Sequence, residues 1–148
     1  MLSISHVATG AFIASKVSNP VIAVPLILAS HFLEDWIPHW DVGTGLSNGS
    51  RKKRSAFVME IGELVVSFAI VFLFWQFHQS GVPTWIYFGG FIGILPDFLM
   101  FPKNFLHSEP FFLRPINAFH KLFHHSTPDM VLGLTPQVVV LLAIFLLK

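Results

Sequence analysis

The sequence contains no cysteine and few charged residues. Without cysteine the chain forms no disulfide bond and no thiolate metal site, so only His, Asp and Glu side chains remain as strong metal ligands. Lys, Arg, Asp and Glu make up 11% of the 148 residues, whereas roughly 25% is usual in soluble domains. Because 53% of the residues are hydrophobic, the composition predicts a protein whose surface lies largely in lipid.

A strong positive charge and a secretory signal are also missing. The net charge is only +1 and the one basic run, residues 51–54, is short, so we expect no nucleic-acid partner. The first residues lack the basic start and the cleavage site of a signal peptide, so we expect the first apolar stretch to stay in the mature protein. The length predicts a single transmembrane domain over residues 1–148, and no pattern indicates an oligomeric state.

Long apolar stretches fill most of the chain. A helix needs about 20 apolar residues to cross the ~30 Å hydrocarbon core of a bilayer. Residues 57–78, 84–101 and 130–147 reach or approach that length. Residues 2–36 are also apolar, but the turn-like residues 16–20 interrupt them, which predicts two short helices in a hairpin. The sequence therefore predicts an all-α fold, an integral membrane helical bundle of about five spans.

The positions of Lys and Arg predict the orientation of these spans. If each span crosses the membrane once, seven of the nine basic residues fall on one side: residues 51–54, Lys103, Arg114 and Lys121. An excess of positive charge marks the cytoplasmic side. The turn at residues 78–81 then lies on the opposite side, with Lys16 and Lys148. We therefore expect a multi-pass protein of the inner or plasma membrane with its polar site on the cytoplasmic side.

In this topology all eight carboxylates and seven of the eight His side chains fall at or near the cytoplasmic face. A charged side chain near hydrocarbon costs about 2.5 to 3.5 kcal/mol. A cluster at one depth therefore predicts a shared counter-charge, for which a divalent metal ion, Zn²⁺ above all, is suited. The alternative is that carboxylates at the ends of spans reach the water of the headgroup region and need no partner.

The densest pattern of such residues runs from residue 31 to residue 41. His31 and Asp35 are four residues apart, so on a helix they lie on one face and can hold one ion. Pro38 predicts the end of that helix just before it, which leaves His39 and Asp41 to fold back toward the same ion. The alternative is that Asp35 is a helix-end charge and His39 an interfacial residue.

A second pattern holds three His residues within six positions. His120 and His124 have the four-residue spacing that suits two imidazoles on one cation, and His125 follows directly. The alternative is an amphipathic surface helix whose His side chains face water.

Single residues near the same predicted depth complete the candidate set. Asp97 ends an otherwise uncharged span and His6 begins the first one, so both are added to the metal ligands. Glu34, Glu60 and Glu63 are candidate catalytic residues, each able to accept a proton from water. Because Glu60 and Glu63 lie near the start of a predicted helix, stabilisation by the helix dipole is an equal alternative for them.

At these residues the chain resembles two groups of proteins. The early His6, the apolar hairpin, the Leu-Pro-Asp segment 95–97 and the His-rich segment 120–126 resemble prokaryotic inner-membrane proteins described as metal-dependent hydrolases. That resemblance implies site roles for His6, Asp35 or Asp97, His120 and the pair 125–126. Residues 31–39 are similar to the His-Phe-x-x-Asp then Pro-x-His stretch of zinc-dependent phospholipases C and single-strand nucleases, which implies zinc binding there.

These features predict a membrane-embedded, metal-dependent hydrolase that acts at the cytoplasmic interface. A site at headgroup depth predicts membrane lipid as partner and a lipid-borne substrate. The basic run at 51–54 favours a phosphoester as the substrate. The alternative is that this run only reflects the topology. The alternatives are a noncatalytic metal-binding membrane protein and a metal-ion transporter. The apolar middles of the predicted spans argue against transport.

Overall fold

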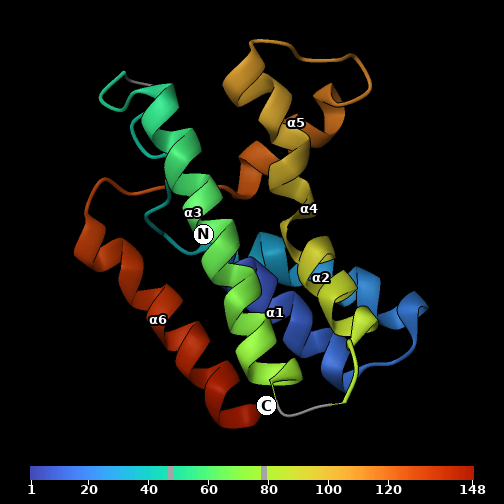
Figure 1. Cartoon of the computed structure of the whole chain (residues 1–148). Helices are drawn as coiled ribbons and strands as arrows, with labels where there is room; N and C mark the ends of the chain where they lie inside the picture. Colours follow the sequence, from blue (N-terminus) through green and yellow to red (C-terminus); the bar gives the residue numbers. More distant parts are fainter. Residues whose placement is uncertain (47–48, 78–79) are drawn as a thin grey trace.

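The computed structural model of the chain describes residues 1–46, 49–77 and 80–148, which form an all-helical bundle without β-strands (Figure 1). The six α-helices are α1 (Ser3–Lys16), α2 (Pro20–Trp36), α3 (Lys53–Val71), α4 (Thr84–Leu106), α5 (Arg114–Phe123) and α6 (Met130–Leu147). The hairpin predicted for residues 2–36 is confirmed as α1 and α2, and α2 ends two residues before Pro38.

Three of these helices are long and apolar enough to cross a membrane. They are α3 together with its π-helical continuation η1 (Phe72–Gln76), α4, and α6. The predicted count of five spans is not confirmed, because α1 has 14 residues and α2 has 17. At 1.5 Å per residue these helices measure only about 21 and 26 Å, less than the ~30 Å hydrocarbon core.

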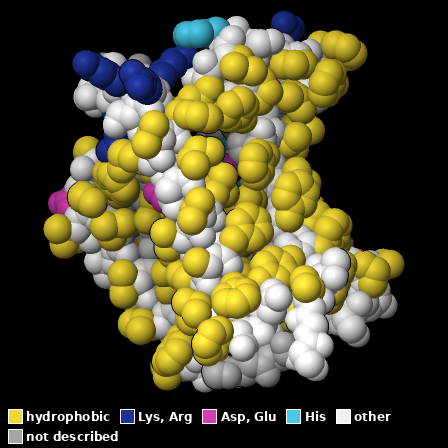
Figure 2. All heavy atoms as spheres, viewed as in Figure 1, with side chains coloured by type: hydrophobic (Ala, Val, Ile, Leu, Met, Phe, Trp, Pro, Cys, Tyr) yellow, Lys and Arg dark blue, Asp and Glu magenta, His cyan; other side chains and the backbone are white. Residues whose placement is uncertain are grey.

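The outer surfaces of α3 and α6 are apolar. Only 11% of the most apolar window of α3 and 17% of that of α6 are buried within the protein. Hydrophobic side chains cover most of the face shown in Figure 2, and the Lys and Arg side chains visible there gather at one end. A face of this kind suits the hydrocarbon of a bilayer rather than water.

Small residues let α1 cross α4 at very short range. A Cβ atom added to Gly10 of α1 would overlap the carbonyl oxygen of Gly89 in α4, and one added to Gly93 would overlap the carbonyl oxygen of His6. Close backbone approach at Gly and Ala is a common way to pack membrane helices. This crossing places His6 beside the middle of α4.

The bundle has two opposite ends, and the segments after α2 and after α5 run between them (Figure 1). The α1–α2 turn, the start of α4 and the end of α6 share one end, which we call the Lys16 end. There the indole of Trp85 donates to the carbonyl of Val17 at 3.1 Å. The start of α3, the end of α4 and α5 form the other, the α5 end. The turn predicted at residues 78–81 lies partly outside the described residues.

Candidate metal centre

A short stretch of paired backbone brings the two His-rich segments together. His39 donates its backbone N–H to His125 at 3.0 Å, and Thr127 donates to the carbonyl of His39 at 2.7 Å, which forms an isolated parallel bridge between His39 and Ser126. The N–H of His125 also donates to the carbonyl of Asp35 at 3.0 Å. The segment after α2 and the segment after α5 are therefore held side by side although about 85 residues separate them in sequence.

The first donor group lies between α2, α4 and α5 and consists of His31, Asp35, Asp97 and His120. Nε2 of His31 and Nε2 of His120 are 3.2 Å apart. Oδ2 of Asp35 lies 3.0 Å from Nε2 of His120 and 3.5 Å from that of His31. Oδ1 of Asp97 completes the group at 3.4 Å from His120. His31, Asp35 and His120 are buried, and Asp97 is half-buried.

The second donor group consists of Asp35, His39 and His124. Here Asp35 presents its other oxygen, because Oδ1 lies 3.6 Å from Nε2 of His39. Nε2 of His39 is 3.4 Å from Nε2 of His124. Oδ2 of Asp41 lies 3.3 Å from each of these two nitrogens, yet it is buried and makes no hydrogen bond of good geometry. A carboxylate oxygen so placed among donors is a fitting ligand for a cation.

Backbone carbonyls fix the ring orientation of His31 and His39. Nδ1 of His31 lies 2.8 Å from the carbonyl oxygen of Gly93, and Nδ1 of His39 lies 2.8 Å from that of Ile37. Because a carbonyl oxygen only accepts, each Nδ1 carries the hydrogen and each neutral ring presents the lone pair of Nε2. That lone pair points to the Nε2 atom of another His in its group, so a proton or a metal ion must lie between the two nitrogens.

The spacing of the donors fits tetrahedral coordination. With bonds of about 2.0 to 2.1 Å, neighbouring ligand atoms of a tetrahedron lie roughly 3.3 Å apart. The two His–His distances are close to that value, at 3.2 and 3.4 Å. So are the distances from the Asp35 oxygens to His31, His39 and His120, which range from 3.0 to 3.6 Å. The chemistry and spacing of the donors therefore fit two ions that share Asp35.

His6 lies next to both groups without belonging to either. Its Nε2 is 3.1 Å from Oδ1 of Asp35, and its Nδ1 is 2.9 Å from Oε2 of Glu34. Glu34 is buried and also accepts a hydrogen bond from the hydroxyl of Thr9. The amino group of Met1 contacts the same Asp35 oxygen. The Glu34 carboxylate therefore lies against the His6 ring, and Oδ1 of Asp35 lies beside the positively charged amino group of Met1.

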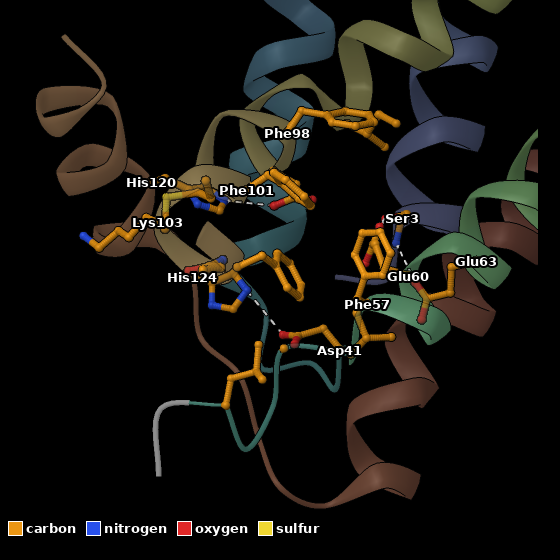
Figure 3. Close-up of a pocket in the computed structure, with 18 of the residues that line it drawn as sticks. Ser3, Asp41, Phe57, Glu60, Glu63, Phe98, Phe101, Lys103, His120 and His124 are labelled. Atoms are coloured by element: carbon orange, nitrogen blue, oxygen red, sulfur yellow. Dashed lines mark hydrogen bonds and ion pairs between the residues drawn. The ribbon is translucent and has the colours of Figure 1, made fainter. Parts of the chain in front are cut away.

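A cavity of about 580 Å³ opens beside the two groups, bounded by α3, α4, α5 and the loop after α2 (Figure 3). Its polar lining consists of Ser3, Asp41, Glu60, Glu63, Asp97, His120 and His124. In Figure 3, Ser3, Glu60 and Glu63 lie across the cavity from His120 and His124. The hydroxyl of Ser3 donates to Glu60, and its N–H donates to Glu63 at 3.1 Å. Within the described part of the chain, none of the four carboxylates that line the cavity forms an ion pair with Lys or Arg.

The loop residue Asp41 and His124 at the end of α5 favour their charged forms. Burial alone raises the pKa of the Asp41 carboxyl, but the imidazoles of His124 and His39 outweigh it and lower that pKa below its usual range. Burial alone lowers the pKa of His124, but Asp41 and Asp35 outweigh it and raise that pKa. This part of the site is therefore arranged for a negative carboxylate beside a positive charge.

No protein-family model matches the chain, and no curated protein or solved structure matches it. The interpretation of the site therefore depends on its own donor geometry.

The structure gathers most of the residues singled out from the sequence, in a different grouping. His31 and Asp35 share one group, whereas His39 falls in the second group, and the pair His120 and His124 is divided between the two. His125 lies apart from both, with an exposed side chain whose Nδ1 contacts the carbonyl of Phe123 at 2.8 Å.

Among the candidate catalytic residues, Glu60 and Glu63 line the cavity, whereas Glu34 is not among its lining residues. Ser3 and Gln137 were not singled out from the sequence. Gln137 is buried in α6, accepts from the N–H of Leu2 at 2.8 Å and donates to the carbonyl of Trp40 at 2.7 Å. Its only sequence signal is a polar side chain in the middle of an apolar span.

Proposed function

We propose that the protein is a membrane-embedded, metal-dependent hydrolase that binds two divalent metal ions and cleaves a phosphoester in the cavity. One ion is assigned to His31, Asp35, Asp97 and His120, and the other to Asp35, His39, Asp41 and His124. The observation that carries the proposal is the buried Asp35, which belongs to both donor groups: Oδ2 lies 3.0 and 3.5 Å from His120 and His31, and Oδ1 lies 3.6 Å from His39. A carboxylate that bridges two ions is a common arrangement in hydrolytic two-metal sites.

The donor set favours zinc. It consists of imidazole nitrogens and carboxylate oxygens, without sulfur, at the spacing of a tetrahedron. Magnesium and calcium prefer six or more oxygen ligands, and the described residues offer too few oxygens in each group for that. Two nitrogen ligands in each group instead match the usual zinc sites.

The remaining polar side chains fit roles in hydrolysis. Bound metal supplies a Lewis acid and lowers the pKa of water toward neutrality. Glu60 and Glu63 lie across the cavity from the two donor groups, where either can accept the proton of the attacking water. Ser3 holds both carboxylates, which orients them. Hydrolysis adds one water: its hydroxyl joins the phosphorus, the ester P–O bond breaks, and the leaving alcohol oxygen takes the proton.

The charge distribution supports the orientation in which the cavity faces the cytoplasm. The cavity lies nearer the α5 end of the bundle, where Lys53, Lys103 and Lys121 line its mouth. Seven of the nine basic residues belong to segments at that end. By the positive-inside rule this distribution supports the proposal that the α5 end faces the cytoplasm across the inner or plasma membrane.

Metal content and activity of one variant test this proposal. We expect the purified protein to hold two zinc ions after incubation with Zn²⁺ and dialysis, and to hydrolyse a soluble phosphodiester. Asp35→Asn, which removes the shared charge, should lose both ions and lower the rate roughly 100-fold or more, since even indirect metal partners are worth 10- to 100-fold. Asp129→Asn is the matched control, because this exposed residue only caps α6 and asparagine caps equally well. Wild-type protein without bound metal would contradict the proposal.

Metal-ion transport is a second candidate because the donors lie within the length of a spanning helix. Asp97 is 13 residues from the start of α4 and 9 from its end. Toward the Lys16 end, however, the apolar cluster of Ala14, Ala23, Ile27 and Ile92 closes the bundle, and an ion would have to cross it. Zinc flux into liposomes that contain the protein separates the two functions: a hydrolase retains its ions and shows no flux.

A further inference from the structure

Large apolar side chains line the cavity together with the polar ones. Phe57 and Ile61 of α3 and Phe98 and Phe101 of α4 line it, and the rings of Phe57 and Phe101 are in contact, with 6.1 Å between their centroids. The donors His120, His124 and Asp41 line the same cavity (Figure 3). Phe57, Ile61 and Phe98 remain 41%, 46% and 45% exposed in the folded protein. Large apolar side chains of this kind beside the donor groups suit a substrate that carries an apolar chain.

The cavity is open on the side of the bundle that suits lipid. α3 and α4 both pack mainly on α1, and toward the α5 end they meet through the rings of Phe57, Phe101 and Phe105. In Figure 2, acidic side-chain atoms are visible from outside in a hollow between hydrophobic side chains near the middle of the face. Because α3 and α4 are two of the three helices long enough to span a membrane, this opening lies at the depth of hydrocarbon.

We infer that the substrate is a membrane phospholipid whose acyl chain passes between α3 and α4 into the bilayer. This inference rests on the proposed hydrolase function and specifies its substrate class. Phe57, Ile61, Phe98 and Phe101 hold the chain, so we call them the chain portal. A lipid enters sideways from its own leaflet, and its phosphoester linkage reaches the metal donors while its acyl chains stay in hydrocarbon.

Cationic side chains at the mouth fit the phosphate of such a lipid. Lys53 and Lys121 both line the cavity at the α5 end, and the Nζ of Lys53 lies 2.8 Å from Nε2 of His107. Lys103 lines the same mouth, but its ammonium pairs with Glu109 at 2.8 Å and points away from the cavity. A phosphate between the metal ions and Lys53 or Lys121 has positive charge on two sides, while its chain contacts only apolar side chains.

A bulky substitution in the portal tests the inference. Ile61→Trp fills the opening, whereas Val65→Trp adds the same side chain one helical turn away, at an exposed position that does not line the cavity. The readout is kcat/KM for long-chain phosphatidylglycerol in micelles divided by kcat/KM for bis(p-nitrophenyl) phosphate. We expect this ratio to fall roughly tenfold in Ile61→Trp, the effect of losing contacts worth about two methylene groups. It should keep its wild-type value in Val65→Trp.

The outcomes separate this inference from the proposed function. If the protein hydrolyses the soluble diester and Ile61→Trp leaves the ratio at the wild-type value, the hydrolase stands and the chain portal is wrong. If the protein hydrolyses neither compound, the proposed function fails, and the portal is then judged by binding. In native mass spectrometry, long-chain phosphatidylglycerol retained by wild type and Val65→Trp but lost from Ile61→Trp supports the portal, and equal retention by all three overturns it.

Discussion

At the scale of single residues, Gln137 shows how a polar side chain in a spanning helix supports the site. It is buried, and it joins the backbone of Leu2 to that of Trp40, the residues that precede α1 and follow His39. Gln137→Leu has nearly the same volume and leaves both backbone groups without a partner. We expect it to lower the free energy of unfolding by about 1–3 kcal/mol and to weaken metal binding.

Denaturant unfolding in detergent, followed by zinc titration of the folded protein, measures both effects. Thr135→Val is the control, because Thr135 also lies on α6 but is exposed and bonds only to the carbonyl of Val131 in its own helix, at 2.9 Å. Equal stability of the Gln137 and Thr135 variants would mean that the links to Leu2 and Trp40 contribute nothing.

Residue type and spacing predicted which side chains gather, but not how they divide. The four-residue spacing succeeded for His31 and Asp35, because both lie within α2. It misgrouped His120 and His124, because α5 ends at Phe123 and His124 adopts an extended backbone. Residues 125–127 instead pair with the backbone beside His39, a contact between distant segments that no local spacing encodes.

At the scale of elements, α5 places His120 in one donor group, and the residue that follows α5, His124, lies in the other. His120 lies 3.0 Å from one oxygen of Asp35, whereas His124 lies 3.4 Å from His39 in the other group. We expect His120→Ala and His124→Ala each to reduce the zinc content from two ions to one, and the double variant to hold none. Metal analysis of the three purified variants measures this.

A different result would follow if both imidazoles held a single ion, as the sequence spacing suggested. Each single variant would then lose the same ion, and the double variant would be no worse than either. His107→Ala is the control, since His107 is exposed at the end of α4 and belongs to neither group.

The crossing of α1 and α4 offers a test of packing between elements. In Gly10→Ala the new methyl group meets the backbone of Gly89, which cannot move without separating the two helices. We expect a loss of about 1–3 kcal/mol in the free energy of unfolding, the usual cost of overpacking. Gly62→Ala in α3 is the matched control: its new methyl group meets nothing within 4 Å, so it should stabilise the helix by roughly 0.5–1 kcal/mol. Thermal unfolding of both variants in detergent measures the two changes in stability; if Gly10→Ala is as stable as Gly62→Ala, the close approach of α1 and α4 at Gly10 is contradicted.

The elements themselves were largely predictable from hydropathy. The three long apolar stretches became α3 with η1, α4 and α6, because a run of about 20 apolar residues has few other ways to satisfy its backbone in lipid. The role of the hairpin was not predictable in the same way. α1 is largely buried against α4, whereas α2 packs one face on α4 and leaves Val21 and Leu33 exposed; together they bring His6, His31 and Asp35 into the bundle.

At the scale of the whole molecule, the donor groups lie among apolar helices, and the cavity beside them lies toward one end of the bundle. The hairpin of α1 and α2 turns at the Lys16 end, and the cavity extends from the donor groups toward the α5 end (Figures 1 and 3). This asymmetry gives the protein a polar half and a closed, apolar half. Its orientation in the membrane therefore decides which compartment the polar half faces.

Labelling of single cysteines determines that orientation, and the chain is suited to it because it has no cysteine of its own. Lys121→Cys and Lys16→Cys place exposed thiols at the α5 end and the Lys16 end, respectively. We expect a membrane-impermeant maleimide to label Lys16→Cys in intact cells and Lys121→Cys only in inverted vesicles, because the basic residues concentrate at the α5 end. The reverse pattern would retain the spanning topology but turn the cavity outward. Labelling of both positions from one side would instead mean that the two ends do not lie on opposite faces of the membrane. The chain portal would then no longer open into hydrocarbon.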